Sequence, residues 1–198
     1  MSNKDDWLKK AEIDYFSKFV PLWLAFNSWY RSHYPDISNS DRAFLNHIKE
    51  DCSPRNALFT SFKDLMTEAH TKKHTKFISD IEAFHYSLNR ADLKYCKANG
   101  SNSGYKICYE NSLLKFESLN DHTSYEDITI PYTKSVEKIK LNEIAFVPEY
   151  SKIFASTIEI IYQIRCYLFH GELKPEKDEH EAVKYSYELL KAMMGNLR

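Results

Sequence analysis

The chain has 198 residues, 43% of them hydrophobic and 28% charged, which is typical of one soluble domain with a sizeable core. Its 27 basic and 28 acidic residues give a net charge of −1, so bulk positive charge cannot attach it to nucleic acid, and any such contact needs a local site or an assembled groove. No apolar run approaches the ~20 residues that cross a bilayer, and no apolar leader opens the sequence, so we expect a cytoplasmic protein without membrane contact.

Glycine and proline counts indicate the fold class, and cysteine spacing indicates the state of the thiols. Four glycines and six prolines are too few for the many hairpins of an all-β fold, so we expect an all-α fold. The spacing of the four cysteines fits no zinc pattern, and we interpret them as free thiols in a reducing compartment. They are Cys52, Cys96, Cys108 and Cys166.

Helical periodicity begins near the N-terminus. Apolar residues recur at helical spacing over residues 5–34, with Pro21 inside as a kink or a division into two helices, and Pro35 at the end. A second helix is expected over residues 41–51, capped by Ser40 or Asp41.

Residues 54–91 carry a third apolar repeat, which Pro54 can open. Its middle, "HTKKHTK" at residues 70–76, is polar and is either a break or a solvated turn. The first group of core helices is therefore expected over about residues 5–92.

Residues 95–147 differ in composition from the rest. We expect a flexible loop at 96–106, a small hairpin that pairs 105–110 with 113–118, and a short strand at 126–131. The segment has too few apolar residues for a core of its own. It is interpreted as an insertion that packs on the helices, so that residues 1–198 form a single domain.

The second group of core helices is expected over about residues 148–195. Pro148 can open the first of them, and Gly171 is placed to end it in the left-handed conformation. Asp178 can cap the last helix. The predicted architecture is a helical bundle with a short decorated insertion in the middle of the chain.

Arg165 and His170 stand out on the penultimate helix. Five steps of 100° place them roughly 140° apart, on one broad side of the helix. They could serve chemistry on a phosphate, or they could be structural. In the structural reading, the helix dipole stabilises His170, and Arg165 pairs with Glu143 or Glu159.

Two segments carry a resemblance to a known family. "YQIRCYLFHGE" at residues 162–172 holds an R-x4-H motif near the end of a long helix, and "FVPLWLAFNSWYRSHY" at residues 19–34 is similar to the first helix of prokaryotic members. On both, the chain resembles the higher eukaryotes and prokaryotes nucleotide-binding (HEPN) superfamily.

The resemblance implies a HEPN-like helical bundle that forms a homodimer through the Arg165/His170 helix, with the two motifs facing a shared cleft. Many members are metal-independent endoribonucleases of toxin–antitoxin or phage-defence systems. RNA would then be the substrate, and a cognate antitoxin protein a further partner. Other members are inactive and bind nucleotides or protein partners.

The two residues suit RNA cleavage without a metal or another cofactor. His170 is a suitable general base or acid near neutral pH, and the permanent charge of Arg165 can hold the phosphate. The RNA 2′-OH is an internal nucleophile, so the expected products are a 2′,3′-cyclic phosphate and a 5′-OH.

Other residues near the motif are candidates for supporting roles. Asn27 is a polar group on an apolar helix and could hydrogen-bond the motif or a backbone group, whereas Glu172 and Lys174 could touch RNA or be solvated. Cys166 and Tyr167 occupy places where active members often carry Asn, Asp or His.

Three alternatives remain beside the nuclease. One is a catalytically inactive HEPN-like dimeric module that binds a protein partner or a nucleotide, which the Cys166 and Tyr167 departure favours. Another is a purely structural helical adaptor. The third concerns a different site, because His70 and His74 have the i, i+4 spacing of metal ligands but no evident third ligand, and a surface turn is the other reading.

Overall fold

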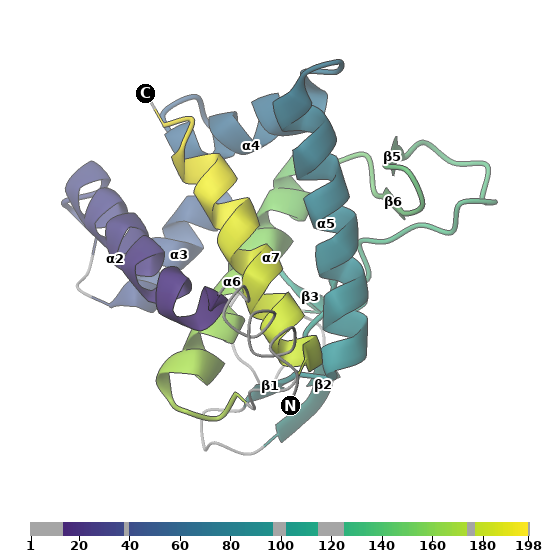
Figure 1. The fold of residues 1–198 in the computed structure, drawn as a ribbon. Helices are drawn as coiled ribbons and strands as arrows, with labels where there is room; N and C mark the ends of the chain where they lie inside the picture. Colours follow the sequence, from purple (N-terminus) through teal and green to yellow (C-terminus); the bar gives the residue numbers. More distant parts are fainter. Residues whose placement is uncertain (1–13, 38–39, 97–101, 115–124, 174–176, 198) are drawn as a thin grey trace, which may run out of the picture.

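The protein was analysed as a computed structural model, which describes residues 14–37, 40–96, 102–114, 125–173 and 177–197. In these residues the fold is mainly helical, as expected, with short strands between the helices (Figure 1). The helices are α2 (Tyr15–His33), α3 (Asp41–Glu50), α4 (Ala57–Thr67), α5 (Lys72–Ala91), α6 (Tyr150–Phe169) and α7 (Lys177–Met194).

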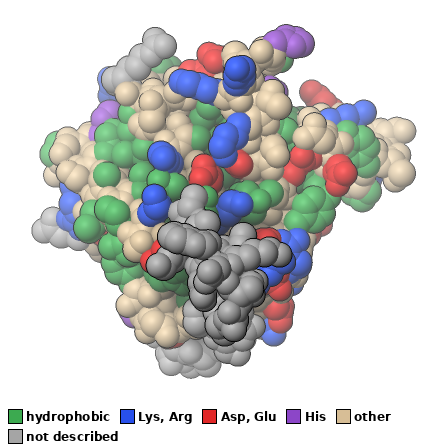
Figure 2. All heavy atoms as spheres, viewed as in Figure 1, with side chains coloured by type: hydrophobic (Ala, Val, Ile, Leu, Met, Phe, Trp, Pro, Cys, Tyr) green, Lys and Arg blue, Asp and Glu red, His purple; other side chains and the backbone are tan. Residues whose placement is uncertain are grey.

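Helix α6 is the centre of the bundle. From residue 153 to residue 164 every residue except Tyr162 is buried, including the polar residues Ser156, Thr157, Glu159 and Gln163. Helices α3 and α4 pack against α6, and α7 packs between α2 and α5 (Figure 1). The face formed by α2, α7 and α5 carries both basic and acidic side chains (Figure 2). No helix in the described ranges is both long enough and apolar enough to span a bilayer.

Capping side chains set where the first helices begin. Ser40 Oγ accepts a hydrogen bond of 3.1 Å from the Ala43 amide, which confirms Ser40 as the cap of α3. Asp14 caps α2, and the part of the first predicted helix before Asp14 lies outside the described residues. Pro21 lies within α2, which continues as one helix to His33.

The predicted helix over residues 54–91 is two helices. The chain breaks between α4 and α5, where His70 adopts a left-handed φ of 72°, so the break falls at the start of the polar segment. Helix α4 begins at Ala57 and not at Pro54. The reason is the buried side chain of Asn56, which accepts from the Phe59 amide and donates to the Ile48 carbonyl.

Both C-terminal helices begin differently from the prediction. Helix α6 starts at Tyr150 after Glu149, two residues beyond Pro148. Asp178 lies inside the first turn of α7, where it accepts from Arg90 Nε at 3.2 Å.

The insertion pairs its strands differently from the prediction, although it packs on the helices as expected. The predicted hairpin of residues 105–110 with 113–118 is wrong, because residues 102–106 pair with 94–96, Tyr109–Asn111 form a short 3-10 helix, and Leu113 pairs with Tyr125. Residues 115–118 lie outside the described ranges. The antiparallel pairs are β1 (Lys94–Cys96) with β2 (Asn102–Lys106), β3 (Ser112–Leu113) with β4 (Tyr125–Glu126), and β5 (Ile139–Lys140) with β6 (Ala145–Phe146).

A buried charge cluster joins α3 to α6. Glu159 Oε2 accepts from Lys49 Nζ at 2.7 Å and from Arg42 Nη1 at 2.6 Å, while Oε1 accepts from Gln163 at 2.7 Å. Burial raises the pKa of Glu159, but the two cations outweigh burial and lower it from 4.5 to about 2. Burial lowers the pKa of Lys49, because the loss of hydration outweighs the attraction of Glu159 and Glu50, and Arg42 adds a like charge.

We predict that Glu159→Gln lowers the free energy of unfolding at pH 7 by about 3–5 kcal/mol, because it leaves the Lys49 ammonium buried without a counter-ion. Urea denaturation measures the change. Glu137→Gln removes an exposed carboxylate and is the matched control, with an expected change within about 0.5 kcal/mol.

The same variant has a pH signature. A carboxylate whose folded pKa is lowered stabilises the protein above its unfolded pKa, and this contribution is lost as pH falls from 4.5 towards 2. The stability of Glu159→Gln should therefore fall less steeply over this range than that of the wild type. Parallel pH profiles for the two proteins would contradict the assignment.

Candidate functional site

The Arg165 guanidinium is fixed in place but not enclosed. Its Nη2 donates to Asp41 Oδ2 at 3.3 Å, and its Cζ lies 4.5 Å from the Phe169 ring centre and 5.4 Å from that of Trp23. The side chain remains 21% exposed, and its buried Nε has no partner among the described residues. One ion pair and two rings therefore orient a cation that an anion from solution can still reach.

Asp41 connects three helices at this point. It is the first residue of α3, and its Oδ1 accepts from Arg31 Nη2 at 2.9 Å and from Asn27 Nδ2 at 3.1 Å. With Arg165 on the other oxygen, one carboxylate holds groups from α2 and α6. The positive end of the α3 dipole stabilises its charge further.

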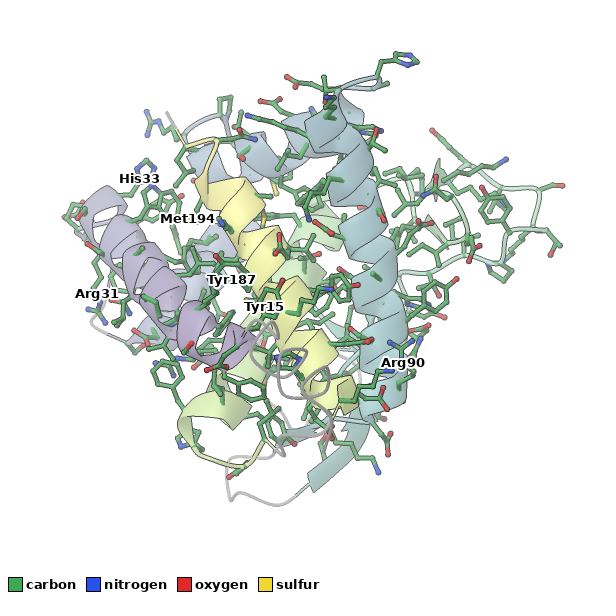
Figure 3. The ribbon with its side chains drawn as sticks, in the orientation of Figure 1. Tyr15, Arg31, His33, Arg90, Tyr187 and Met194 are labelled. Carbon is green, nitrogen blue, oxygen red and sulfur yellow. The ribbon has the colours of Figure 1, made fainter. Side chains whose placement is uncertain are left out.

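Asn27 orients a second arginine towards Asp41. Its Oδ1 accepts from Arg31 Nε at 2.8 Å, and both residues lie on one stripe of α2. Figure 3 shows Arg31 on the side of α2 that faces away from α7. The predicted hydrogen bond from Asn27 to the motif or to a backbone group is not formed; Asn27 bonds the side chains of Tyr30, Asp41 and Arg31, and Asp41 in turn accepts from Arg165.

His170 ends α6 and has an exposed side chain. The prediction for Gly171 is confirmed, because its φ is 70° and its amide donates to the Leu168 carbonyl, while the Glu172 amide donates to the Tyr167 carbonyl. Among the described residues the His170 ring makes no hydrogen bond or ion pair. The structure therefore places His170 on the same helix end as Arg165, and among the described residues no hydrogen bond joins the two side chains.

The remaining candidates are less closely connected to Arg165. Cys166 is half-buried, and burial raises the pKa of its thiol. The Tyr167 hydroxyl donates to the Lys94 carbonyl at 2.5 Å and so ties α6 to β1. Glu172 is exposed, and Lys174 lies outside the described residues.

The structural reading paired Arg165 with Glu143 or Glu159, but its carboxylate partner is Asp41. Glu159 is already saturated by its own buried partners, and Glu143 accepts from the Tyr86 hydroxyl at 3.1 Å. The sequence analysis missed Asp41 and Arg31 as members of this site. The i, i+4 spacing of Asn27 and Arg31 was an available indication, whereas nothing local in the sequence links Asp41 to Arg165.

The charges around Arg165 sum to a local positive excess. Four cations, Arg31, Arg42, Lys49 and Arg165, stand against the carboxylates of Asp41, Glu159 and, near Lys49, Glu50, which leaves one positive charge on a chain whose net charge is −1. An anion near Arg165 would meet this excess at short range.

The described residues contain no group of three or more His, Cys, Asp or Glu side chains that could hold a metal ion. The alternative of a site at His70 and His74 therefore lacks a third ligand there. The His74 ring instead bonds the Leu65 carbonyl through Nδ1 at 3.0 Å, which ties α5 to α4.

Comparison with known proteins identifies no relative. No family model matches the chain, and neither a curated protein nor a solved structure matches it. The chemistry of the site must therefore be inferred from its own geometry.

A double-mutant cycle with Asp41→Asn and Arg165→Met should give a coupling energy of about 0.5–1 kcal/mol, because both partners are about one-fifth exposed and share one hydrogen-bonded ion pair. Urea denaturation of the four proteins measures it. In the control cycle, Asp36→Asn takes the place of Asp41→Asn. Because Asp36 is an exposed loop residue, this variant should show no coupling with Arg165→Met. Additive effects of Asp41→Asn and Arg165→Met would contradict the ion pair.

Proposed function

We propose that the protein is a metal-independent endoribonuclease of the HEPN type, which cleaves RNA to 2′,3′-cyclic phosphate and 5′-OH ends. The observation that carries the proposal is the state of Arg165. Its guanidinium is held by the Asp41 carboxylate, which also binds Arg31, in a region with excess positive charge. It lies on the same helix end as the exposed His170.

The Asp41 carboxylate indicates how RNA could bind. Its two oxygens accept from Arg165 and Arg31, and the non-bridging oxygens of a phosphodiester offer a similar pair of acceptors. An RNA phosphate that replaced or joined Asp41 would be held by guanidinium groups that are already oriented. The cost of ordering these side chains is therefore met before the substrate arrives.

His170 supplies the proton chemistry in this proposal. Neutral imidazole takes the proton of the 2′-OH, the 2′-oxygen forms a bond to phosphorus, and the bond from phosphorus to the 5′-oxygen breaks. Imidazolium returns a proton to the 5′-oxygen as it leaves. Arg165 stabilises the extra negative charge of the phosphorane. The freedom of the His170 ring permits this approach.

The proposal includes a homodimer through the Arg165/His170 helix, and two exposed apolar side chains beside the charged cluster support it. Phe169 is 43% exposed on α6, and Leu24 is 58% exposed on the same stripe of α2 as Asn27 and Arg31. Two copies of the chain would bring together two sets of Arg165 and His170. A cytoplasmic role in a toxin–antitoxin pair or in phage defence, with a cognate antitoxin as partner, belongs to the same proposal.

A second candidate is a catalytically inactive HEPN-like dimeric module that binds a protein partner or a nucleotide. The specific observation in its favour is that Arg165 already has a carboxylate partner, Asp41, within its own chain. The Tyr167 hydroxyl is likewise engaged with a backbone carbonyl and not with the motif.

We predict that the purified protein cleaves single-stranded RNA in the presence of EDTA and that His170→Ala lowers the rate by about 10²–10⁴-fold, the usual contribution of a general base or acid. Arg165→Met should lower it comparably, and end-group analysis should find cyclic phosphates. His70→Asn, which changes another exposed histidine, is the control and should cleave as the wild type does. A wild type no more active than His170→Ala would favour the inactive module.

For the dimer, sedimentation of the wild type should give twice the mass of one chain. The variants Phe169→Glu and Leu24→Glu should each sediment as a monomer, because each would bury a charge at the proposed contact. Val136→Glu is the matched control, because Val136 is equally apolar and 46% exposed but lies on the arm that carries β5. A monomeric wild type, or a dimer that only Val136→Glu disrupts, would exclude this interface.

A further inference from the structure

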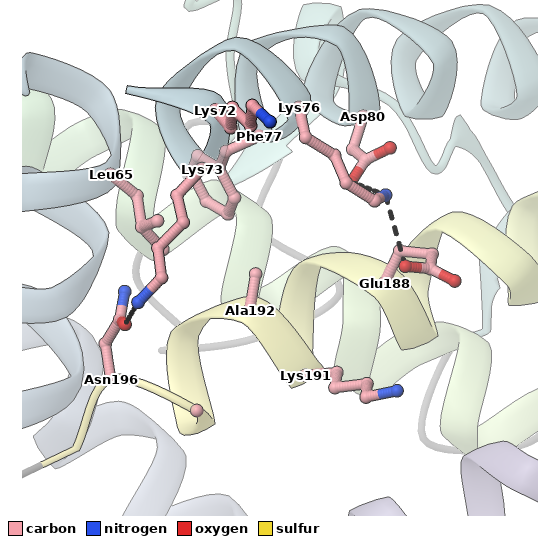
Figure 4. Close-up of a pocket in the computed structure, with 11 residues that line it drawn as sticks. Leu65, Lys72, Lys73, Lys76, Phe77, Asp80, Glu188, Lys191, Ala192 and Asn196 are labelled. Atoms are coloured by element: carbon pink, nitrogen blue, oxygen red, sulfur yellow. Dashed lines mark hydrogen bonds and ion pairs between the residues drawn. The ribbon is translucent and has the colours of Figure 1, made fainter. Parts of the chain in front are cut away.

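A second hollow lies between the beginning of α5 and the end of α7 (Figure 4). Its volume is about 480 Å³, which falls within the usual range for small-molecule sites. In Figure 1 this region and the end of α6 lie at opposite ends of the bundle, so the hollow is separate from the Arg165 site. Its lining residues are Leu65, Lys72, Lys73, Lys76, Phe77, Asp80, Glu188, Lys191, Ala192, Gly195 and Asn196.

Lysines dominate the charged groups of this hollow. Lys76 is neutralised, because its Nζ pairs with Asp80 at 2.6 Å and with Glu188 at 3.2 Å, as the dashed lines of Figure 4 show. In the described part of the chain, the other three ammonium groups have no carboxylate partner. They belong to Lys72, Lys73 and Lys191.

The surroundings of these lysines offset their charge only in part, because Glu188 attracts Lys191 without forming an ion pair with it. Lys73 Nζ donates to the neutral amide oxygen of Asn196 at 2.8 Å, and Lys191 Nζ lies 5.2 Å from the Tyr187 ring centre. Lys72 and Lys73 also form the first turn of α5, where the positive end of the helix dipole opposes a cation. Their placement therefore costs stability in the absence of an anion.

The floor of the hollow is apolar. Phe77 and Leu65 contribute buried side chains from α5 and α4, and Ala192 adds a small side chain from α7. Gly195 completes the wall at the end of α7, and a Cβ added there would lie 3.1 Å from the Lys191 carbonyl oxygen. A ligand can thus place an uncharged ring or chain against the floor, and the ammonium groups, which Figure 4 shows at separate points around the hollow, can reach its anionic group by rotation of their flexible side chains.

We propose that this hollow binds a small organic phosphate, with its phosphate group on Lys72, Lys73 and Lys191 and its apolar part on Phe77 and Leu65. Compact ammonium groups suit the point charge of a terminal phosphate. The basic side chains of this face are interspersed with acidic ones (Figure 2), which disfavours a long polyanion and favours a small ligand. The site does not depend on the proposed ribonuclease activity.

Phenyl phosphate is a suitable probe, because it carries both parts of the predicted ligand, and inorganic phosphate and phenol carry one each. Calorimetric titration of the full chain should show saturable 1:1 binding of phenyl phosphate that is about tenfold or more tighter than that of either fragment. The double variant Lys73→Met/Lys191→Met should weaken this binding about tenfold or more, since both cations are lost.

Lys18→Met removes an exposed lysine of α2 and is the charge-matched control, with unchanged binding expected. Lys73 and Lys191 are themselves exposed, so circular dichroism should show the double variant folded. No saturable binding of phenyl phosphate, equal loss in Lys18→Met, or binding no tighter than that of inorganic phosphate would overturn the proposal. Loss of RNA binding in the double variant, with phenyl phosphate binding unchanged, would overturn it in favour of a nucleic-acid surface.

Discussion

The Asp41 carboxylate is the interaction on which the candidate site depends. Arg31 and Arg165 come from different helices, and their like charges would separate them without a shared counter-ion. Asp41, in the first turn of α3, makes them converge by accepting from both. The site is thus a pair of arginines organised by a carboxylate.

Beneath that pair, Glu159 performs the equivalent role for Arg42 and Lys49, but in full burial. The carboxylates of Glu159 and Asp41 differ in whether they can release their cationic partners. Glu159 cannot leave its partners without stranding a buried lysine, so it fixes the spacing of α3 and α6. Asp41 is one-fifth exposed and can share its arginines with an incoming anion. The buried Glu159 cluster therefore holds α3 and α6 in place, while the partly exposed Asp41 site can adapt to an anion.

The sequence predicted well what depends on local spacing. Ser40 as a cap, the end of α2 before Pro35 and Gly171 at the end of α6 each follow from the preferences of a few neighbouring residues. The start of α4 was misplaced because the buried Asn56 side chain decided it, and that depends on contacts with the preceding turn.

The partner of Arg165 could not be predicted, because Asp41 lies 124 residues away along the chain. Periodicity identifies which residues share a helix face, but it does not identify which carboxylate of a different helix faces them. Glu159 was a reasonable expectation from its place on α6 itself. It was wrong because Lys49 and Arg42, on α3, already donate to one of its oxygens, and the predicted bounds of that helix did not show which of its side chains face α6. The prediction of strand pairing in the insertion was wrong for a similar reason. Ile107 and Tyr109 are buried in the core, and this burial overrides pairing between neighbouring segments.

The most direct test of the central claim is the dissociation constant of a 2′-O-methyl RNA, which cannot be cleaved, for the wild type and for Arg165→Met. If Arg165 binds the phosphate, its loss should weaken binding about tenfold or more, as expected for a charged hydrogen bond. Equal affinities for the two proteins would contradict the account, because the arginine held by Asp41 would then have no part in binding RNA.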